Sequence, residues 1–491
     1  MPSSVPEPPL DAASAVFKEM MAETTSFLAA FLDQLPQAPA SNPSAAEAHA
    51  FLADPRNRAL PAEHGRPLSE LLATIGAAAE IGLNTAGGGY LAFIPGSGLV
   101  TAAMADLISG VLNRYTGIAA GAPALVALEL DVIRWLARLM GMPDDAGGIL
   151  TSGASIANLS ALLCAKTACL PDDFRAGTIY ATDQAHHCIA KALRLAGFPK
   201  DALRLVPADE RLRMDANALR LMIAADRARG RQPFCIVANA GTTNTGAIDP
   251  LDTLADIARA HRLWFHVDAA YGGFFRLTDR GRQKMSGIER ADSVVLDPHK
   301  GLFLPFGTGC LLVRDSTALH RAHAGDDAAY LQDLDDALVN FADHSLELTR
   351  PNRGLRLWLP LHLHGVAAFR SMLDEKIDLA EQAYRALCGI PQIAVFGAPD
   401  LSILAFRCRL PHGAADAEDR ATMELTRQVN AEGRVFLSTT RIGGRAMARI
   451  AVLNHRTRTA DILAAVDAIG RAAAALPPDA AGSSTTASSD R

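Results

Sequence analysis

The sequence predicts an α/β protein with a mostly parallel central sheet, helices on both faces of that sheet, and a smaller α+β domain behind it. Two observations carry this prediction. In the middle of the chain, short apolar runs alternate with helical segments, a pattern typical of parallel strands that are covered on both faces. After residue 370, helical patterns and two further strand-like runs indicate the second domain.

The individual elements follow from local residue patterns. An amphipathic helix is expected from Val16 to Leu35, because apolar residues recur there mostly at steps of three and four, and a short helix is expected over 67–83. The strands expected in the large sheet are 178–181, 203–206, 234–238, 263–267, 293–296 and 310–313. The helices expected between them include 156–167, 216–229 and 252–262, and the small domain is expected to hold strands 402–407 and 448–452.

These patterns divide the chain into four parts. We expect an amino-terminal helical segment over 1–98, a large domain over 99–370, a small domain over 371–475 and a disordered tail over 476–491. The amino-terminal helix must bury its apolar stripe either on its own domain or on a partner subunit.

Composition and charge exclude several function classes. The 491 residues carry 47 Lys and Arg against 53 Asp and Glu, a net charge of −6, which argues against nucleic acid or an anionic membrane as the main partner. No apolar run is long enough to cross a bilayer, and the first residues lack the features of a signal peptide. The seven cysteines are odd in number and scattered, so neither a disulfide framework nor a structural zinc site is expected. We therefore expect a cytoplasmic protein.

Polar residues directly follow five of the apolar runs. Ligands of parallel sheets bind beyond the carboxyl ends of the strands, so these residues are the first candidates for a site. They are the segments 151–155, 183–187, 241–243, 268–270 and 297–300.

The segment from Gly148 to Ser155 leads directly into a helix. Small residues let the backbone approach an anion, and a helix amino terminus offers free N–H groups to a phosphate. A simple serine cap of the helix is the alternative interpretation.

Two adjacent histidines, His186 and His187, precede Cys188 and raise the question of a metal. Adjacent side chains point in different directions and no second cluster completes a zinc site, so no metal is expected. His186 alone, just past a strand, better fits a residue that stacks on an aromatic ligand.

Asp268 and Lys300 each follow an apolar strand. A carboxylate leaving a dry strand needs a cationic partner or good donors, although it could also cap the next segment. A lysine at such a place can lose its proton through desolvation and act as a nucleophile, although an exposed structural lysine would look the same.

Together, four of these residues match the needs of one cofactor. Pyridoxal 5'-phosphate requires an anion cradle, a ring-stacking group, an acidic partner for its ring nitrogen and a lysine that forms a Schiff base. Ser155, His186, Asp268 and Lys300 supply these in chain order, each at the end of a strand.

Three motifs also resemble a known family. YATDQAHHCIAKALRLAG (180–197), WFHVDAAYGG (264–273) and DPHKGL (297–302) look like the group II pyridoxal-phosphate amino-acid decarboxylases, which include aromatic-L-amino-acid decarboxylase. The resemblance runs from about Gly89 to Gly365.

The resemblance implies a type I, aspartate aminotransferase-like fold and a homodimer with active sites at its interface. Lys300 would carry the cofactor, His186 would stack on its ring, Asp268 would pair with the ring nitrogen, and Ala270 would pack on the other face. The phosphate would be surrounded by Ala154, Ser155, Thr243 and His299. Tyr330 resembles the loop tyrosine that protonates the substrate carbon after CO₂ leaves, so amine rather than aldehyde is the expected main product.

The resemblance implies an amino-acid substrate and suggests an aromatic one, because Phe93, Ile94 and Pro95 resemble the pocket wall of the aromatic decarboxylases. Two departures leave the substrate open: Ile156 stands where the family usually has an acidic residue, and bulky pocket residues are lacking around Gly117. A small or acidic amino acid is the alternative.

Other activities also fit parts of the pattern. Ser155, Asp268 and His299 follow the chain order of an α/β-hydrolase triad, but that interpretation leaves Lys300 and His186 unexplained. An aldehyde synthase or an aminotransferase would use the same cofactor, and the latter needs an arginine clamp that Arg350, Arg353 or Arg356 could supply. A catalytically inactive binding protein is disfavoured while the lysine, aspartate and histidine are all present.

Overall fold

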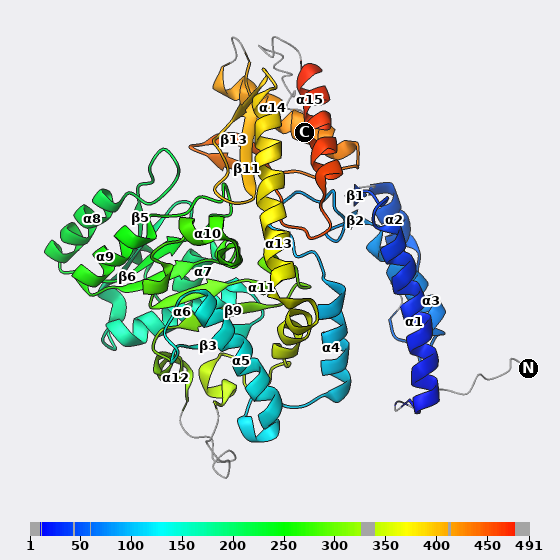
Figure 1. Ribbon diagram of the computed structural model, residues 1–491, viewed down its shortest axis with the longest axis horizontal. Coiled ribbons are helices and arrows are strands. Elements are labelled where there is room, and N and C mark those ends of the chain that lie inside the picture. The colour runs from blue at the N-terminus through cyan, green and yellow to red at the C-terminus, as the bar shows by residue number, and fades with distance from the viewer. Residues whose placement is uncertain are drawn as a thin grey trace, which may run out of the picture.

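A computed structural model describes residues 10, 12–42, 45–58, 60–325, 339–410 and 414–476. Figure 1 shows three parts: a large domain around a central sheet, a smaller domain at the carboxyl-terminal end, and amino-terminal helices that stand to one side. The long helix α13 (Gly354–Cys388) connects the first two, and its backbone is interrupted at Gly365, where φ is 73°.

The central sheet has seven strands in the order β3-β9-β8-β7-β6-β4-β5. Their bounds are β3 Gly147–Thr151, β4 Gly177–Thr182, β5 Leu203–Val206, β6 Gln232–Asn239, β7 Trp264–Asp268, β8 Ser293–Leu296 and β9 Gly309–Val313. Only β9 runs against its neighbours β3 and β8; the pairs from β8 to β5 are parallel. The expected mostly parallel sheet is therefore confirmed, while β3 is a strand that the sequence patterns did not predict.

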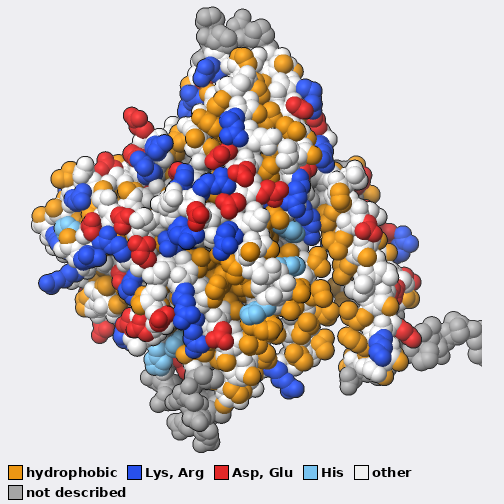
Figure 2. All heavy atoms as spheres, in the orientation of Figure 1, with side chains coloured by type: hydrophobic (Ala, Val, Ile, Leu, Met, Phe, Trp, Pro, Cys, Tyr) orange, Lys and Arg blue, Asp and Glu red, His pale blue; other side chains and the backbone are white. Residues whose placement is uncertain are grey.

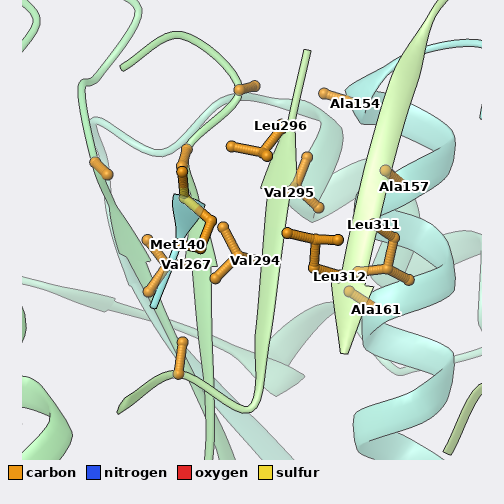
Figure 3. Close-up of a cluster of buried hydrophobic side chains, with 14 of the residues drawn as sticks. Met140, Ala154, Ala157, Ala161, Val267, Val294, Val295, Leu296, Leu311 and Leu312 are labelled. Carbon is orange, nitrogen blue, oxygen red and sulfur yellow. The ribbon is translucent and has the colours of Figure 1, made fainter. Parts of the chain in front are cut away.

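Both faces of the sheet are covered. Every residue of β4, β7, β8 and β9 is buried, and consecutive residues of a strand point to opposite faces. Figure 3 shows how helix α6 (Ala154–Cys169) contributes: its Ala154, Ala157 and Ala161 face the strands that carry Leu311 and Val295. Small side chains at this contact allow the helix to approach the sheet closely.

The remaining helices of the large domain connect and flank the strands. They are α4 Val100–Leu112, α5 Pro123–Leu139, α7 Cys188–Leu195, α8 Ala216–Ala228, α9 Leu251–His261, α10 Asp279–Lys284, α11 Pro298–Gly301 and α12 Thr317–His323. The sequence patterns predict α6, α8 and α9 to within two residues at each end.

The small domain is α+β, as expected. Its antiparallel sheet has the order β10-β11-β13-β12, with β10 Ile393–Val395, β11 Ile403–Cys408, β12 Ser438–Ile442 and β13 Arg445–Ala451. Helices α14 (Ala415–Ala431) and α15 (Thr459–Ala474) pack on it, and Phe406, Leu425 and Ile469 lie in a core separate from that of the large domain.

The amino-terminal segment contains α1 (Ser14–Gln34), α2 (Ala45–Ala53) and α3 (Leu68–Ala79). The same segment contains a short antiparallel pair of strands, β1 (Ser41–Asn42) and β2 (Gly82–Leu83). None of the residues of α1 or α3 is buried, and both helices expose large apolar side chains. Across the described ranges, no helix is both long and apolar enough to span a bilayer.

Candidate active site

The carboxyl ends of the parallel strands surround a cavity of about 300 Å³. All eight residues predicted from the sequence to hold a cofactor line it: Ala154, Ser155, His186, Thr243, Asp268, Ala270, His299 and Lys300. The lining also includes Ser152, Gly153, Ile156, Asn239, Gly241, Thr242, Tyr271 and Asp297. Five strand-end segments that lie up to 149 residues apart in the chain thus meet at one place, as the rule for parallel sheets predicts.

One wall of the cavity is the amino-terminal end of α6. The backbone N–H of Ala154 donates to Asp297 Oδ1 at 2.7 Å, which fixes the start of the helix against the segment after β8. Gly309 of β9 passes so close that a Cβ on it would lie 2.5 Å from the carbonyl carbon of Gly153. The amino-terminal end of α6 therefore presents the positive end of the helix dipole to an anion in the cavity, and the hydroxyl of Ser155 can donate a hydrogen bond to it.

A second wall of the cavity comes from the loop Gly241 to Gly246, of which Gly241, Thr242 and Thr243 line the cavity. Gly241 has φ 103°, and a Cβ there would lie 2.7 Å from the ring of Tyr271, so only glycine fits. The loop is held from outside by Arg449 of β13, whose guanidinium donates to the carbonyl oxygens of Thr243 and, at 2.9 Å, of Asn244.

Arg449 is a buried cation whose hydrogen-bond acceptors are neutral. Besides the loop, it donates to Ser438 Oγ at 2.9 Å and to the carbonyl of Phe93 at 3.5 Å. Burial lowers its pKa to about 10, so it stays charged near neutral pH. One side chain of the small domain thus ties the Thr243 loop to the segment around Phe93.

Asp268 presents a carboxylate at the end of β7 and is only 7% exposed. Its Oδ1 accepts the N–H of Ala270 at 3.1 Å, and its Oδ2 accepts Nδ2 of Asn158 at 3.0 Å. None of the described residues forms an ion pair with it. A buried carboxylate that faces a cavity without a cation is suited to a cationic group of a ligand.

Lys300 lies in α11, and its Nζ is 2.8 Å from Oδ2 of Asp297, the carboxylate whose other oxygen accepts the first N–H of α6. Burial by itself would lower the pKa of Lys300, but the charge of Asp297 and its hydrogen bond outweigh burial and raise that pKa. The sequence predicts that desolvation lowers the pKa of this lysine, but the neighbouring carboxylate of Asp297 has the larger effect and favours the ammonium form.

The two histidines of the cavity are neutral near pH 7. Burial is the largest influence on both and lowers the pKa of His186 and of His299. His186 Nδ1 lies 3.3 Å from the N–H of Cys188 and accepts from it. His299 Nδ1 donates to the carbonyl of Thr308 at 2.7 Å. A neutral imidazole presents a flat face that can stack on an aromatic ring.

These residues fit pyridoxal phosphate. The helix end and the threonine loop suit its phosphate, the uncompensated carboxylate of Asp268 suits its ring nitrogen, and Lys300 suits its aldehyde. Within the part of the chain that the structure describes, no group of three or more His, Cys, Asp or Glu could hold a metal ion.

The other predicted site residues have different outcomes. Phe93, Ile94 and Pro95 are described but do not line the cavity; they reach it only indirectly, through the contact of Phe93 with Arg449. Tyr330 lies outside the described residues, so its role stays a prediction.

The sequence did not assign Asp297, Asn158 or Arg449 to cofactor binding, although Asp297 belongs to one of the strand-end segments named as candidates. Asp297 stands directly before the Pro-His-Lys segment, and its position was the one signal that could have identified it. Asn158 and Arg449 act through partners more than a hundred residues away, which no local pattern reveals.

The geometry argues against two alternatives. In a hydrolase triad His299 Nδ1 would donate to Asp268, but it donates to the carbonyl of Thr308. The three arginines considered as an aminotransferase clamp pair elsewhere: Arg350 with Glu129 at 2.5 Å, Arg353 with Glu347 at 2.6 Å and Arg356 with Asp106 at 2.7 Å. None of the three lines the cavity.

The type I fold and the lysine–aspartate–histidine cavity define a pyridoxal-phosphate-dependent enzyme. Residues 89–409 match the pyridoxal-dependent decarboxylase conserved domain, and the chain belongs to this family.

Named relatives support the same assignment. The chain is 37% identical to an aromatic-L-amino-acid decarboxylase of Bacillus atrophaeus over 380 residues, 76% of this chain and 78% of the relative. It is 32% identical to an L-2,4-diaminobutyrate decarboxylase of Rhizobium meliloti, with 77% and 76% covered. Its fold matches the crystal structure of Oryza sativa TDC with PLP and tryptamine at a TM-score of 0.88 and 26% identity, covering 95% of this chain and 99% of that one. The protein is therefore a pyridoxal-phosphate-dependent carboxy-lyase that decarboxylates an amino acid.

Proposed function

We propose that the substrate is an aromatic L-amino acid and that the main product is the corresponding amine. The observation that carries this proposal is the conformation of Phe93. Its φ is 52°, a strained value for a bulky residue, and Phe93 is 54% exposed while its carbonyl accepts a hydrogen bond from Arg449. Strain of this kind is commonly kept where a side chain serves a ligand, and an aromatic ring suits an aromatic substrate.

The residues of the cavity would share the work as follows. Bound pyridoxal phosphate supplies an electron sink for the electron pair that remains when CO₂ leaves. Lys300 would hold the cofactor through Nζ, and Asp297 would store or return the proton of that nitrogen across 2.8 Å. Asp268 would hold a proton on the ring nitrogen, and neutral His186 would stack on the ring.

The phosphate would lie between the two walls of the cavity. Ala154, Ser155, Thr243 and His299 would surround it, while Ala270 would pack on the ring face opposite His186. Tyr330 would deliver the proton to the substrate carbon, because a phenol keeps its proton at neutral pH until a strong base is presented.

We propose a homodimer with active sites at its interface. The exposed apolar side chains of α4, which we call the α4 face, are Val100, Met104, Leu107, Ile108, Val111 and Leu112. Figure 2 shows apolar atoms gathered over this region and on the adjoining amino-terminal helices. A patch of this kind is unusual on a monomer and supports burial against a second copy. Light scattering on the purified protein should give about twice the chain mass of 51.9 kDa.

We also propose a cytoplasmic location and the four-part division at residues 98, 370 and 475 given above. All seven cysteines are free thiols, five of them buried, which suits a reducing compartment. The presence of two hydrophobic cores supports two domains, and Leu373, Ile377 and Ile403, which lie beyond residue 370, pack in the core of the large one.

The test of the proposed function is a substrate panel. The holoenzyme is incubated separately with L-tryptophan, L-tyrosine, L-phenylalanine, L-2,4-diaminobutyrate and L-glutamate, and CO₂, amine, aldehyde and ammonia are measured together. We expect the highest kcat/KM on an aromatic substrate and nearly equal amounts of CO₂ and amine. Higher kcat/KM on diaminobutyrate or glutamate would replace the aromatic proposal.

A small, polar substrate is the second candidate. Similarity to the diaminobutyrate decarboxylase at 32% identity favours it, and so does the absence of Phe93, Ile94 and Pro95 from the lining of the described cavity. Phe93→Ala separates the two: it should raise KM for an aromatic substrate and leave KM for diaminobutyrate unchanged.

A further inference from the structure

A chain of four hydrogen bonds crosses the core of the large domain and ends on Asp268. Trp264 Nε1 lies 2.8 Å from Ser293 Oγ, and Ser293 Oγ lies 2.8 Å from His266 Nδ1. His266 Nε2 lies 2.8 Å from Asn158 Oδ1, and Asn158 Nδ2 lies 3.0 Å from Asp268 Oδ2. The intermediate three side chains, Ser293, His266 and Asn158, are fully buried.

The chemistry of its two ends fixes the direction of every bond. An ionised carboxylate only accepts, so Asn158 must turn its NH₂ to Asp268 and its carbonyl to His266. A carbonyl only accepts, so His266 carries its proton on Nε2 and leaves Nδ1 as an acceptor for the hydroxyl of Ser293. The indole of Trp264 only donates, and the oxygen of Ser293 receives it. All four donors therefore point towards Asp268.

This direction of the hydrogen bonds requires the imidazole of His266 to be neutral, and burial of the ring favours the neutral form. Burial lowers the pKa of His266 to about 4, although the charge of Asp268 acts in the opposite direction. The other hydrogen bond of Asn158 Nδ2, to Cys188 Sγ at 3.3 Å, is to a thiol and adds no cation. These side chains thus bring aligned dipoles, not a second charge, to the carboxylate of Asp268.

We propose that Asn158, His266 and Ser293 are positioning residues for the cofactor: they hold the negative charge and the orientation of Asp268 through a one-way hydrogen-bond relay that starts at Trp264. This inference rests on the proposed pairing of Asp268 with the ring nitrogen. Asn158 and the N–H of Ala270 occupy one lone pair on each carboxylate oxygen, which leaves the remaining lone pairs for the ring. Aligned hydrogen bonds polarise one another, so a break far from the cavity weakens the last bond of the series.

The relay is tested by measuring, through absorbance, how tightly pyridoxal phosphate binds to cofactor-free, full-length protein. Asn158→Asp keeps the shape and the acceptor for His266 but replaces the donor to Asp268 with a second carboxylate. A hydrogen bond to a charged group is worth about ten- to a hundred-fold in an equilibrium constant, so we expect at least about ten-fold weaker binding. Ser293→Ala, which leaves Asn158 and Asp268 intact, should weaken binding about two- to five-fold.

Two controls separate the relay from packing. Ser293→Thr retains the hydroxyl and should restore wild-type affinity, whereas Ser160→Ala removes a buried hydroxyl from the same helix as Asn158, outside the relay, and should change nothing. In holoenzyme, Asn158→Asp and Ser293→Ala should also shift the pH at which the absorbance of the bound cofactor changes, and Ser160→Ala should not. Ser293→Ala binding with wild-type affinity would overturn the relay.

A measurement on the cofactor-free wild type needs a variant only to assign one signal, not to bind the cofactor. In protein labelled with ¹⁵N at histidine, His266 is assigned by the signal that His266→Gln removes. The relay requires a neutral ring with a slowly exchanging proton on Nε2 from pH 5.5 to 8. A charged ring or a proton on Nδ1 would contradict the relay.

Asp268→Asn distinguishes failure of the relay from failure of the proposed cofactor pairing. If Asp268→Asn binds pyridoxal phosphate as wild type does, the pairing itself is wrong. If Asp268→Asn weakens binding while Asn158→Asp and Ser293→Ala do not, the pairing stands and the relay is wrong. When both are right, adding Ser293→Ala to Asp268→Asn causes no further loss.

Discussion

Replacement of Arg449 by lysine should weaken cofactor binding. The effect would act from a distance, since Arg449 does not line the cavity but donates hydrogen bonds to the loop that carries Thr243. Its planar guanidinium reaches two successive carbonyls of the cavity loop, those of Thr243 and Asn244, and also Ser438 Oγ. A lysine keeps the charge but has a single nitrogen, which cannot span these acceptors. At least one charge-assisted bond to the loop is lost, at a cost of about 1.5–3 kcal/mol.

If the loop must be ordered again when the cofactor binds, that cost appears as about a ten- to hundred-fold rise in the dissociation constant of pyridoxal phosphate. The assay is absorbance titration of cofactor-free protein. Arg445→Lys is the matched control: Arg445 lies on the same strand, but its guanidinium binds Glu418 and Asp419 on the small domain. Equal dissociation constants for Arg449→Lys, Arg445→Lys and wild type would refute the reasoning.

Three further outcomes are expected. Burial lowers the pKa of His455 to about 3, so below pH 6.5 the unfolded chain binds a proton at this residue and the folded chain does not. The free energy of unfolding therefore decreases as the pH is lowered. Between pH 7 and pH 4.5, urea unfolding should show that wild type loses about 2 kcal/mol more than His455→Gln. Tyr330→Phe should keep cofactor binding and CO₂ release but yield less amine and more aldehyde and peroxide, and an unchanged product ratio would exclude the tyrosine as proton donor. Gly117→Ala places a Cβ 2.5 Å from Tyr115 Oη and should destabilise the fold by about 1–3 kcal/mol, seen as a lower Tm, without changing cofactor affinity.

Much of the large domain could be predicted because its strands are continuous apolar runs. The expected 293–296 coincides with β8, and 263–267 differs from β7 by one residue at each end. β3 was missed because two glycines begin it and a polar segment that already suggested a phosphate loop follows it. Its partner β9 lies more than 150 residues further on, so the pairing leaves no local signal.

The candidate site could be predicted to a similar degree, for a geometric reason. Residues such as Asp268 and Lys300 stand where strands end, and parallel strands bring their ends together whatever lies between them. The protonation of Lys300 could not be predicted, because it depends on Asp297 lying within 2.8 Å of Nζ. Gly117 is another limit of the sequence: it suggested room for a substrate, but a Cβ there meets Tyr115 and the carbonyl of Leu348 within the same chain.

The position of the lysine that carries the cofactor tests the central claim most directly. Holoenzyme is reduced with borohydride, which fixes the cofactor to its lysine, and the digested protein is mapped by mass spectrometry. The site described above predicts the added mass on Lys300 in the wild type and its loss in Lys300→Ala. The same mass on another lysine, for example Lys191, would contradict the assignment of this cavity as the active site.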